Sequence, residues 1–357
     1  MLQPWLETFP STVQPLVDEV DSLLGYKLSD IITNGPNSLL TATIHSQPAI
    51  MASSIIILRV LEKEFGFHPP SRCDYTLGHS LGEFAAFVAA GHVTFADSLY
   101  LVRRRAEVMA HCSKEAVEKT GGEYGMMAIV TEPNHLAPLI KAIEEFTGHQ
   151  TSLTTTDSSD DKPPIQQAVI ANINSKNQIV LSGSIGMIRV LLTHLRSFGG
   201  HDPRAVRLKS DSPFHSPLMR PAQDEMKKLL NMKSRIKGHE EQDIVVWPGN
   251  GIEVVSNVTA RPIRSKQEIK ELWARQTTET VRWWDSIRYL DQECKVRRWV
   301  GVGPGKVGRN LVGKEVGMRG REGGVRGGGV WSIGDPREVE EVLRGLEETE
   351  DMGDEEE

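Results

Sequence analysis

The stretch Gly78-His79-Ser80-Leu81-Gly82 decides how the rest of this chain is interpreted, because it sets a serine at G-x-S-x-G spacing. An extended run, 74–77, precedes it and an apolar-periodic helix follows it. A serine on such a tight strand-to-helix turn adopts strained dihedral angles, and side chains two residues away on either side would collide. The turn projects the hydroxyl of Ser80 outward and puts the N–H of Leu81 at a helix N-terminus, where it can stabilise an oxyanion. The alternative, a chance pentapeptide in a loop, does not account for the strand and helix around it.

The bulk composition is that of a soluble globular protein. The chain has 357 residues, 39% of them hydrophobic and 25% charged, with a net charge of −7 that argues against nucleic acid as the main partner. No apolar run approaches the roughly 20 residues that a membrane span needs. Three widely spaced cysteines fit a reducing compartment and exclude a zinc cluster built on cysteine pairs. We therefore expect neither a membrane span nor a metal site.

The order of predicted elements divides the chain into two parts. Between residues 123 and 205 the pattern reads strand, helix, strand, strand, helix, and a further strand follows, which predicts a small α+β subdomain of ferredoxin-like type. Within it, the Ser-, Thr-, Asp- and Pro-rich residues 147–165 read as a flexible surface insertion. Residues 347–357 carry eight acidic side chains and read as a disordered tail.

Apolar spacing predicts four further helices. A capping threonine, Thr94, is expected to begin one of them, and Pro48 is expected in the first turn of another. Gly91 is expected to end the helix that follows the serine turn. The four predicted helices span residues 13–32, 47–65, 95–112 and 268–290.

Arg105 lies on the apolar stripe of its helix, shared with Leu101, Val102 and Met109. A guanidinium that faces a core needs an anion. One possibility is a structural ion pair with a buried Asp or Glu, and spacing alone favours it. The other is a fork that grips a substrate carboxylate with two hydrogen bonds.

A serine nucleophile also needs a base, and eleven histidines leave the choice open. His79 adjoins the serine, but its side chain should point away from the hydroxyl. His215 lies in the rigid segment Ser212-Pro213-Phe214-His215-Ser216-Pro217. No clear triad acid is present, since the Asp cluster at 157–161 belongs to the predicted insertion. This weakens the hypothesis of a lipase or esterase.

Several separate motifs, in the same order along the chain, resemble those of malonyl-CoA:acyl carrier protein transacylases, whose fold also serves as the acyltransferase domain of polyketide and fatty acid synthases. The resemblance covers roughly residues 13 to 345, and the overall character is similar to fungal mitochondrial members. The motifs that carry it are Gly78-His79-Ser80-Leu81-Gly82-Glu83, Thr43 to Pro48, the Arg105 helix, Phe214-His215-Ser216, Asn257-Val258-Thr259, Arg275-Gln276 and Val302-Gly303-Pro304-Gly305-Lys306.

The resemblance implies a role for each candidate residue. Ser80 would be the nucleophile, His215 its base and Leu81 an oxyanion donor. The backbone carbonyl of Gln276 would orient the histidine, in place of a triad acid. The substrate-binding side chains would be Arg105 on the malonyl carboxylate, Phe214 crowding out an α-methyl branch, Gln47 lining the acyl pocket, and His79.

The resemblance also implies the architecture and the partners. The fold would be an α/β-hydrolase-like large subdomain with a parallel sheet, residues 1–122 and 206–346, with the ferredoxin-like piece 123–205 inserted. The activity would be that of an [acyl-carrier-protein] S-malonyltransferase for fatty acid biosynthesis. Malonyl-CoA, coenzyme A and the phosphopantetheine arm of an acyl carrier protein would be its partners. No cofactor or membrane is implied, and we expect a monomer in the mitochondrial matrix.

The chain departs from the family pattern in one respect. The family opens with a Gly-Gln-Gly-x-Gln loop whose first glutamine supplies a second oxyanion donor, and nothing similar occurs before Leu39. Loss of one such donor can cost roughly 10²–10³-fold in rate. Two alternatives to the transferase therefore stay open: a serine hydrolase or thioesterase that uses the same turn, and a truncated, inactive homologue that binds carrier protein.

Overall fold

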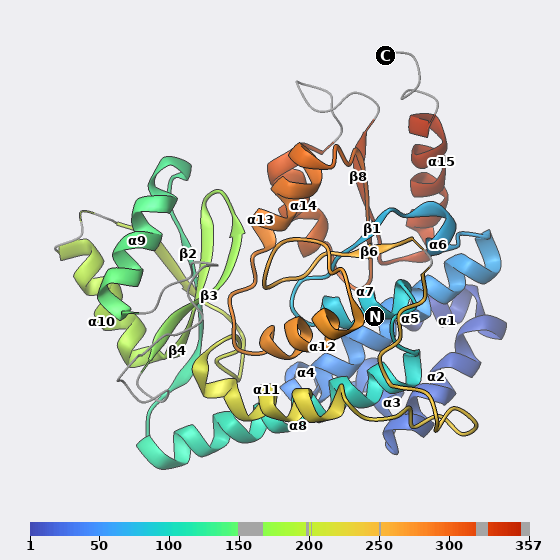
Figure 1. The fold of residues 1–357 in the computed structure, drawn as a ribbon, viewed down its shortest axis with the longest axis horizontal. Helices are drawn as coiled ribbons and strands as arrows, with labels where there is room; N and C mark the ends of the chain where they lie inside the picture. The colour runs from blue at the N-terminus through green and yellow to red at the C-terminus, as the bar shows by residue number, and fades with distance from the viewer. Residues whose placement is uncertain (149–166, 198–199, 201, 250, 319–327, 351–357) are drawn as a thin grey trace.

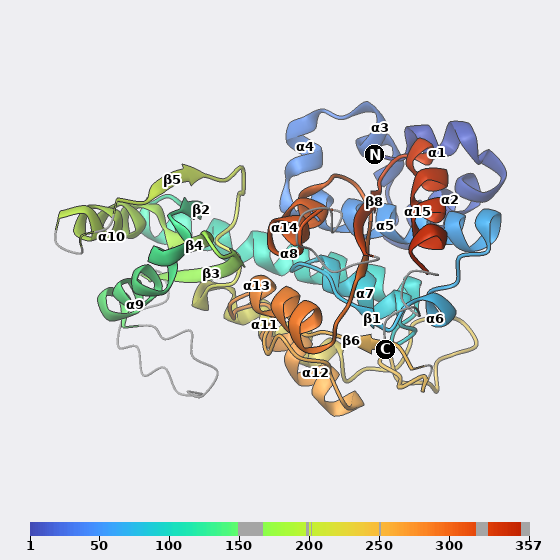
Figure 2. The same ribbon diagram turned by 90° about the horizontal axis from the view of Figure 1, so that it is seen from above.

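A computed structural model describes the chain except for residues 149–166, 198–199, 201, 250, 319–327 and 351–357 (Figure 1). A large helical part contains both ends of the described chain, and a smaller part is built on an antiparallel sheet. The long helix α8 (Phe95–Thr120) leads from the first into the second (Figure 2). Thr94 caps α8 by accepting the N–H of Asp97, as the sequence predicted, but α8 runs well beyond residue 112.

Helix α5 (Thr43–Phe65) is the core of the large part, since fourteen of its side chains are buried. It packs against α2 (Pro10–Leu24), α7 (Gly82–Ala89) and α8. Its length and hydropathy would allow it to cross a membrane, but 67% of its most apolar window is buried inside the fold. The core therefore accounts for its apolar side chains. Pro48 lies inside α5, beyond the first turn where the sequence placed it, because the helix begins at Thr43.

The strands of the large part pair in parallel. β1 (Tyr75–Thr76) pairs with β6 (Glu253–Val254), and β7 (Arg298–Val302) pairs with β8 (Gly329–Ile333). Among the described residues these are two separate two-stranded sheets. Other helices of the large part are α1 (Gln3–Thr8), α3 (Leu28–Asn34), α4 (Asn37–Thr41), α6 (Pro69–Arg72), α11 (Arg220–Leu229), α14 (Val307–Val316) and α15 (Val339–Glu350).

The small part has the β-α-β-β-α-β order of a ferredoxin-like fold. Its four antiparallel strands lie in the order β3-β4-β2-β5. Along β2, Met127 and Ile129 pack with the helices, while Met126 and Ala128 pack on the other side with Phe214. The elements are β2 (Tyr124–Val130), α9 (Leu136–Thr147), β3 (Ala168–Ser175), β4 (Gln178–Ser184), α10 (Ile185–Ser197) and β5 (Arg204–Arg207).

The predicted single helix over residues 268–290 is wrong. The chain forms α12 (Lys266–Arg275) and α13 (Trp283–Arg288), which a π-helical turn follows, and leaves the helical path between them. The reason is tertiary: the N–H of Val281 donates to the carbonyl of Ala171, so this segment bonds to the edge of β3. The break also brings Gln276 to the site described below.

Two predicted flexible segments fall mostly outside the described residues. Of the insertion 147–165, only the last residue of α9 and its cap, Gly148, are described. The predicted acidic tail begins too early, because residues 347–350 form the last turn of α15. Periodic apolar residues upstream, including buried Leu346, carry the helix into the acidic run.

Candidate active site

Ser80 lies at the turn between β1 and α7, as the G-x-S-x-G spacing predicts. Its φ of 51° is in the left-handed region, where residues other than glycine are strained. A Cβ on Gly78 would lie 2.0 Å from the backbone carbon of Gly82, so the turn closes only with glycine at 78. At Gly82 a Cβ would meet nothing within 4 Å. A side chain would therefore collide at Gly78, as the sequence predicts, but not at Gly82.

His215 is in place to act as the base. The Ser80 hydroxyl donates to Nε2 of His215 at 2.7 Å. On the opposite edge of the ring, Nδ1 donates to the backbone carbonyl of Gln276 at 2.8 Å. A carbonyl can only accept, so the proton of the neutral ring is on Nδ1 and Nε2 is free to take the serine proton. His215 also has a strained φ, 53°, and is 2% exposed.

The surroundings of His215 keep it uncharged. Burial, the positive charge of Arg105 and the nearby His79 lower its pKa from 6.5 to about 3. Desolvation and a like charge both disfavour the imidazolium. The ring is consequently an acceptor for the serine proton throughout the neutral pH range.

Arg105 is almost completely buried, at 2% exposure, and its partners are neutral. Its guanidinium donates to Oε1 of Gln47 at 2.8 Å and to Oε1 of Gln276 at 3.2 Å. Its Nε has no partner, and no ion pair reaches it from the part of the chain that the structure describes. Burial lowers its pKa to about 10, and only the charge of Glu83 opposes this. The ion-pair alternative is therefore not realised among the described residues: Glu83 acts on the guanidinium only through its charge, and no carboxylate is bonded to it.

Gln276 connects Ser80, His215 and the buried Arg105. Besides the carbonyl bond to His215, its Nε2 donates to the backbone carbonyl of Ser80 at 2.5 Å, and its Oε1 accepts from Arg105. The family motifs predict only the role of the Gln276 carbonyl and not the contacts of its side chain. No local pattern signals it, because its partners are far away in the sequence.

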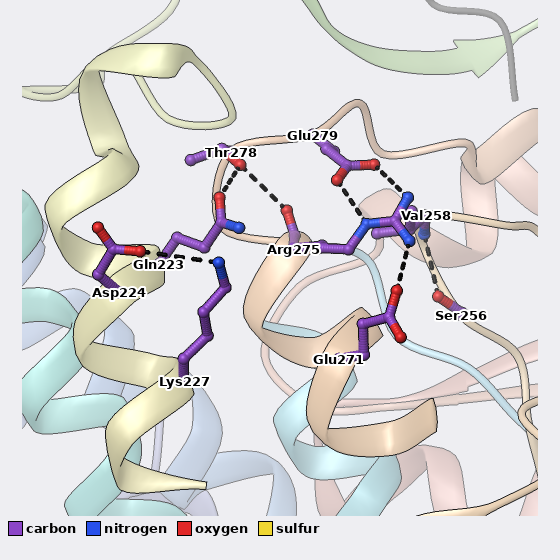
Figure 3. Close-up of polar contacts among 9 residues, drawn as sticks. All are labelled: Gln223, Asp224, Lys227, Ser256, Val258, Glu271, Arg275, Thr278 and Glu279. Carbon is purple, nitrogen blue, oxygen red and sulfur yellow. Dashed lines mark hydrogen bonds and ion pairs between the residues drawn. The ribbon is translucent and has the colours of Figure 1, made fainter. Parts of the chain in front are cut away.

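The loop that carries Gln276 is held by polar contacts on both sides (Figure 3). Arg275 donates to Glu279 at 2.7 Å and to Glu271 at 3.0 Å. Thr278 donates to Gln223 of α11 at 2.6 Å. These contacts fix the loop between α12 and the β3 edge, and with it the carbonyl that orients His215.

The remaining predicted residues lie around this centre. Gln47 fixes Arg105 and donates to Sδ of Met109. The side chain of His79 bonds to the small part, since its Nε2 donates to Asn174 of β3 at 2.9 Å. Phe214 packs between α8 and the small sheet. The N–H of Leu81, at the start of α7, donates to no acceptor among the described residues, so it is available to an oxyanion.

Comparison with known proteins agrees with this geometry. The acyl transferase domain family matches residues 7–132. The malonyl CoA-acyl carrier protein transacylase of Bacillus subtilis (strain 168) is 34% identical over 336 residues, which cover 94% of this chain and 90% of that protein. The chain belongs to the malonyl-CoA:acyl carrier protein transacylase family. The Synechocystis member is 30% identical and covers 81% of this chain, and this chain covers 80% of it.

Solved structures show the same fold for the transacylase family and for this chain. The FabD structure from Acinetobacter baumannii superposes with a TM-score of 0.74 at 26% identity, covering 97% of this chain and 93% of that one. A malonyl-transacylase in complex with its type II polyketide synthase acyl carrier protein gives a TM-score of 0.73 at 26% identity, covering 96% and 94%. The predicted α/β-hydrolase-like and ferredoxin-like fold class is thus confirmed.

Two further residues of this transacylase site, Glu83 and Asn257, lie in the sequence motifs, but the sequence alone predicts no role for them. Glu83 is 1% exposed, and its Oε1 accepts the backbone N–H of Asn257 at 2.8 Å. Its other oxygen has no partner in the described structure. Burial raises the pKa of this carboxyl from 4.5 to about 8, and the bond from Asn257 and the charge of Arg105 offset only part of that rise.

Glu83→Gln is expected to make stability less dependent on pH. Because the folded-state pKa is raised, the folded protein binds more protons than the unfolded chain between pH 4.5 and about 8, and stability falls as pH rises through this window. Glutamine cannot ionise, so the difference between the melting temperature of the variant and that of the parent should increase in favour of the variant from pH 5 to pH 8.

Calorimetry at several pH values checks this, with Glu19→Gln as the control for loss of an exposed carboxylate. Parallel curves for the Glu83 variant and the parent would show that Glu83 is ionised in the fold throughout this range.

Proposed function

We propose that this chain transfers a malonyl group from malonyl-CoA to the phosphopantetheine thiol of an acyl carrier protein, through an ester on Ser80. The observation that carries the proposal is the series of contacts from Ser80 to His215 to Gln276, next to the buried Arg105, whose hydrogen-bond partners are neutral. The contacts from Ser80 to His215 and Gln276 are those of an activated serine nucleophile. The buried guanidinium of Arg105 selects an acyl group that ends in a carboxylate.

In the first step His215 Nε2 accepts the Ser80 proton as Oγ bonds to the thioester carbonyl carbon. The carbonyl oxygen becomes an oxyanion, which the N–H of Leu81 stabilises. When the tetrahedral intermediate collapses, its carbon–sulfur bond breaks and the proton on His215 passes to the sulfur. Coenzyme A leaves as a thiol, and malonyl remains on Ser80 as an ester.

The second step reverses the first with a different thiol. The phosphopantetheine thiol gives its proton to His215 and attacks the ester carbonyl. The bond between Oγ and the carbonyl carbon then breaks, and Oγ recovers the proton from His215. The result is malonyl thioester on the carrier and free Ser80, so the exchange is ping-pong and consumes no other reactant.

Arg105 selects the substrate in this scheme. A malonyl carboxylate can pair with its guanidinium, whereas an acetyl group would leave the buried charge without an anion. Gln47 and Gln276 hold the guanidinium before the substrate arrives, which lowers the ordering cost of binding.

The test is mass spectrometry of the intact chain after mixing with malonyl-CoA. We expect one malonyl adduct on the peptide that contains Ser80, lasting until holo acyl carrier protein is added and then transferred to it. Rapid appearance of free malonate, without transfer, would instead assign the chain as a hydrolase or thioesterase. Absence of any adduct, with retained binding of carrier protein, would make it a non-catalytic homologue.

The compartment and the assembly state belong to the same proposal. We place the protein in the mitochondrial matrix, as a monomer that supplies malonyl groups for fatty acid synthesis there. The family resemblance described above supports the location. Fractionation of source cells with antibody detection tests it, and light scattering of the purified chain tests the monomer.

A further inference from the structure

Asn257 lies beside the nucleophile because of how the strands pair. It follows β6, and the serine turn follows β1. The two strands are parallel neighbours, with Thr76 opposite Val254, so the segments that leave their carboxyl ends are adjacent. Asn257 is 2% exposed and contacts both the serine turn and Glu83 in the first turn of α7.

Every polar group of Asn257 is engaged. Its Oδ1 accepts the N–H of Ser80 at 2.7 Å, and its Nδ2 donates to the carbonyl of Gly78 at 2.8 Å. Its own N–H donates to Glu83 at 2.8 Å, and its carbonyl accepts the N–H of Arg282 at 2.9 Å. If the amide were flipped, its oxygen would face the carbonyl of Gly78 and its NH₂ group would face the N–H of Ser80. Neither pair can form a hydrogen bond, so only one orientation fits.

These bonds hold the turn in its strained form. The left-handed φ of Ser80 costs free energy that the surroundings must offset. Asn257 bonds the backbone on both sides of His79, at Gly78 and at Ser80, and Glu83 on α7 fixes Asn257 in turn. The N–H of Ser80 is engaged by this contact, whereas the N–H of Leu81, at the start of α7, donates to no acceptor among the described residues.

We propose that Asn257 is a positioning residue for the nucleophile: its side-chain amide holds the Ser80 turn so that the hydroxyl stays on His215 and the Leu81 N–H stays free. Because its amide is engaged by the backbone of Gly78 and Ser80, Asn257 acts through the serine and not on the acyl group or the thiol. Its effect is on the rate of the acyl step, because a misplacement of about 1 Å can cost 10²-fold in rate. The inference rests on the proposed Ser80 ester.

The experiment measures turnover per functional serine. Asn257→Ala and Asn257→Asp are compared with the parent and with Asn231→Ala, the matched loss of an exposed asparagine. Stopped-flow release of coenzyme A from malonyl-CoA gives both the burst amplitude, which counts competent Ser80 sites, and the burst rate. Melting temperatures are recorded for all four proteins.

For Asn257→Ala we expect the burst rate per competent site to fall about 10- to 100-fold, with the KM for malonyl-CoA nearly unchanged, because Arg105 is untouched. Asn257→Asp keeps an acceptor for the Ser80 N–H, so its burst rate per competent site should lie between that of Asn257→Ala and that of the parent. Asn231→Ala should match the parent.

A purely structural role would give a different result: a lower melting temperature and a smaller burst amplitude, but a parental rate at each remaining site. That outcome would overturn the inference. A parent chain with no burst at all would instead overturn the proposed Ser80 ester, so the two failures are distinguishable.

Discussion

Ser80→Ala is expected to reduce malonyl transfer by about 10⁴-fold or more, because it removes the atom that carries the acyl group in the proposed mechanism. The fold should survive, since serine and alanine differ by one oxygen and the Ser80 backbone contacts to Asn257 and Gln276 remain. Transfer to holo carrier protein, followed by gel shift of the malonylated carrier, measures the loss. Ser71→Ala, at an exposed position of α6, is the matched control.

His215→Ala should cost nearly as much, and the double variant Ser80→Ala/His215→Ala little more than either single one. When two residues act as a unit, removing either one already removes the rate contribution of both. The effects of the two substitutions on the logarithm of the rate are therefore far from additive. Additive losses would show that the hydrogen bond between Ser80 and His215 is not used in the reaction. Equal residual transfer by parent and Ser80→Ala would rule out the serine ester altogether.

The serine turn could be predicted from sequence because its determinants are local. A glycine two residues before Ser80, an extended run and an apolar-periodic helix are all within a short window, and the structure shows the same arrangement. The βαββαβ order of the small part was predictable for the same reason, since each element carries its own periodicity. The cap at Thr94 and the left-handed Gly91 are likewise properties of a few neighbouring residues.

The contacts that assemble the site could not be predicted from local patterns. The helix break at Gln276 depends on a bond between Val281 and β3, more than one hundred positions earlier in the chain. Asn257 and Glu83 act on the serine turn through pairings that only parallel strands and tertiary packing create. Spacing alone also favoured an ion pair for Arg105, because periodicity shows that a side chain faces the core but not what it meets there.

Arg105→Gln is expected to lower kcat/KM for malonyl-CoA by about 10²- to 10³-fold, since removing one partner of a buried charge pair costs about 3–5 kcal/mol. Use of acetyl-CoA should change far less, because acetyl has no carboxylate to pair. Competition between the two thioesters, read by mass spectrometry of the carrier, gives the ratio directly. Arg104→Gln is the control, because Arg104 pairs with Glu107 and Glu225 at the surface, where ion pairs contribute little. Equal losses for both thioesters would reject the carboxylate clamp.

The same variant should change how His215 titrates. Burial is the main cause of the low pKa of His215, and the charge of Arg105 is the second. Removing that charge raises the pKa, so protonation of the base, and the loss of kcat/KM at acid pH, should begin at a higher pH in Arg105→Gln than in the parent. A bound malonyl carboxylate offsets the arginine charge in the same way, which makes His215 a stronger base only when a diacid is present. Arg105→Lys keeps the charge, so its kcat/KM should fall at the same acid pH as in the parent. If kcat/KM of Arg105→Gln also falls at the parental pH, Arg105 and His215 are not electrostatically coupled.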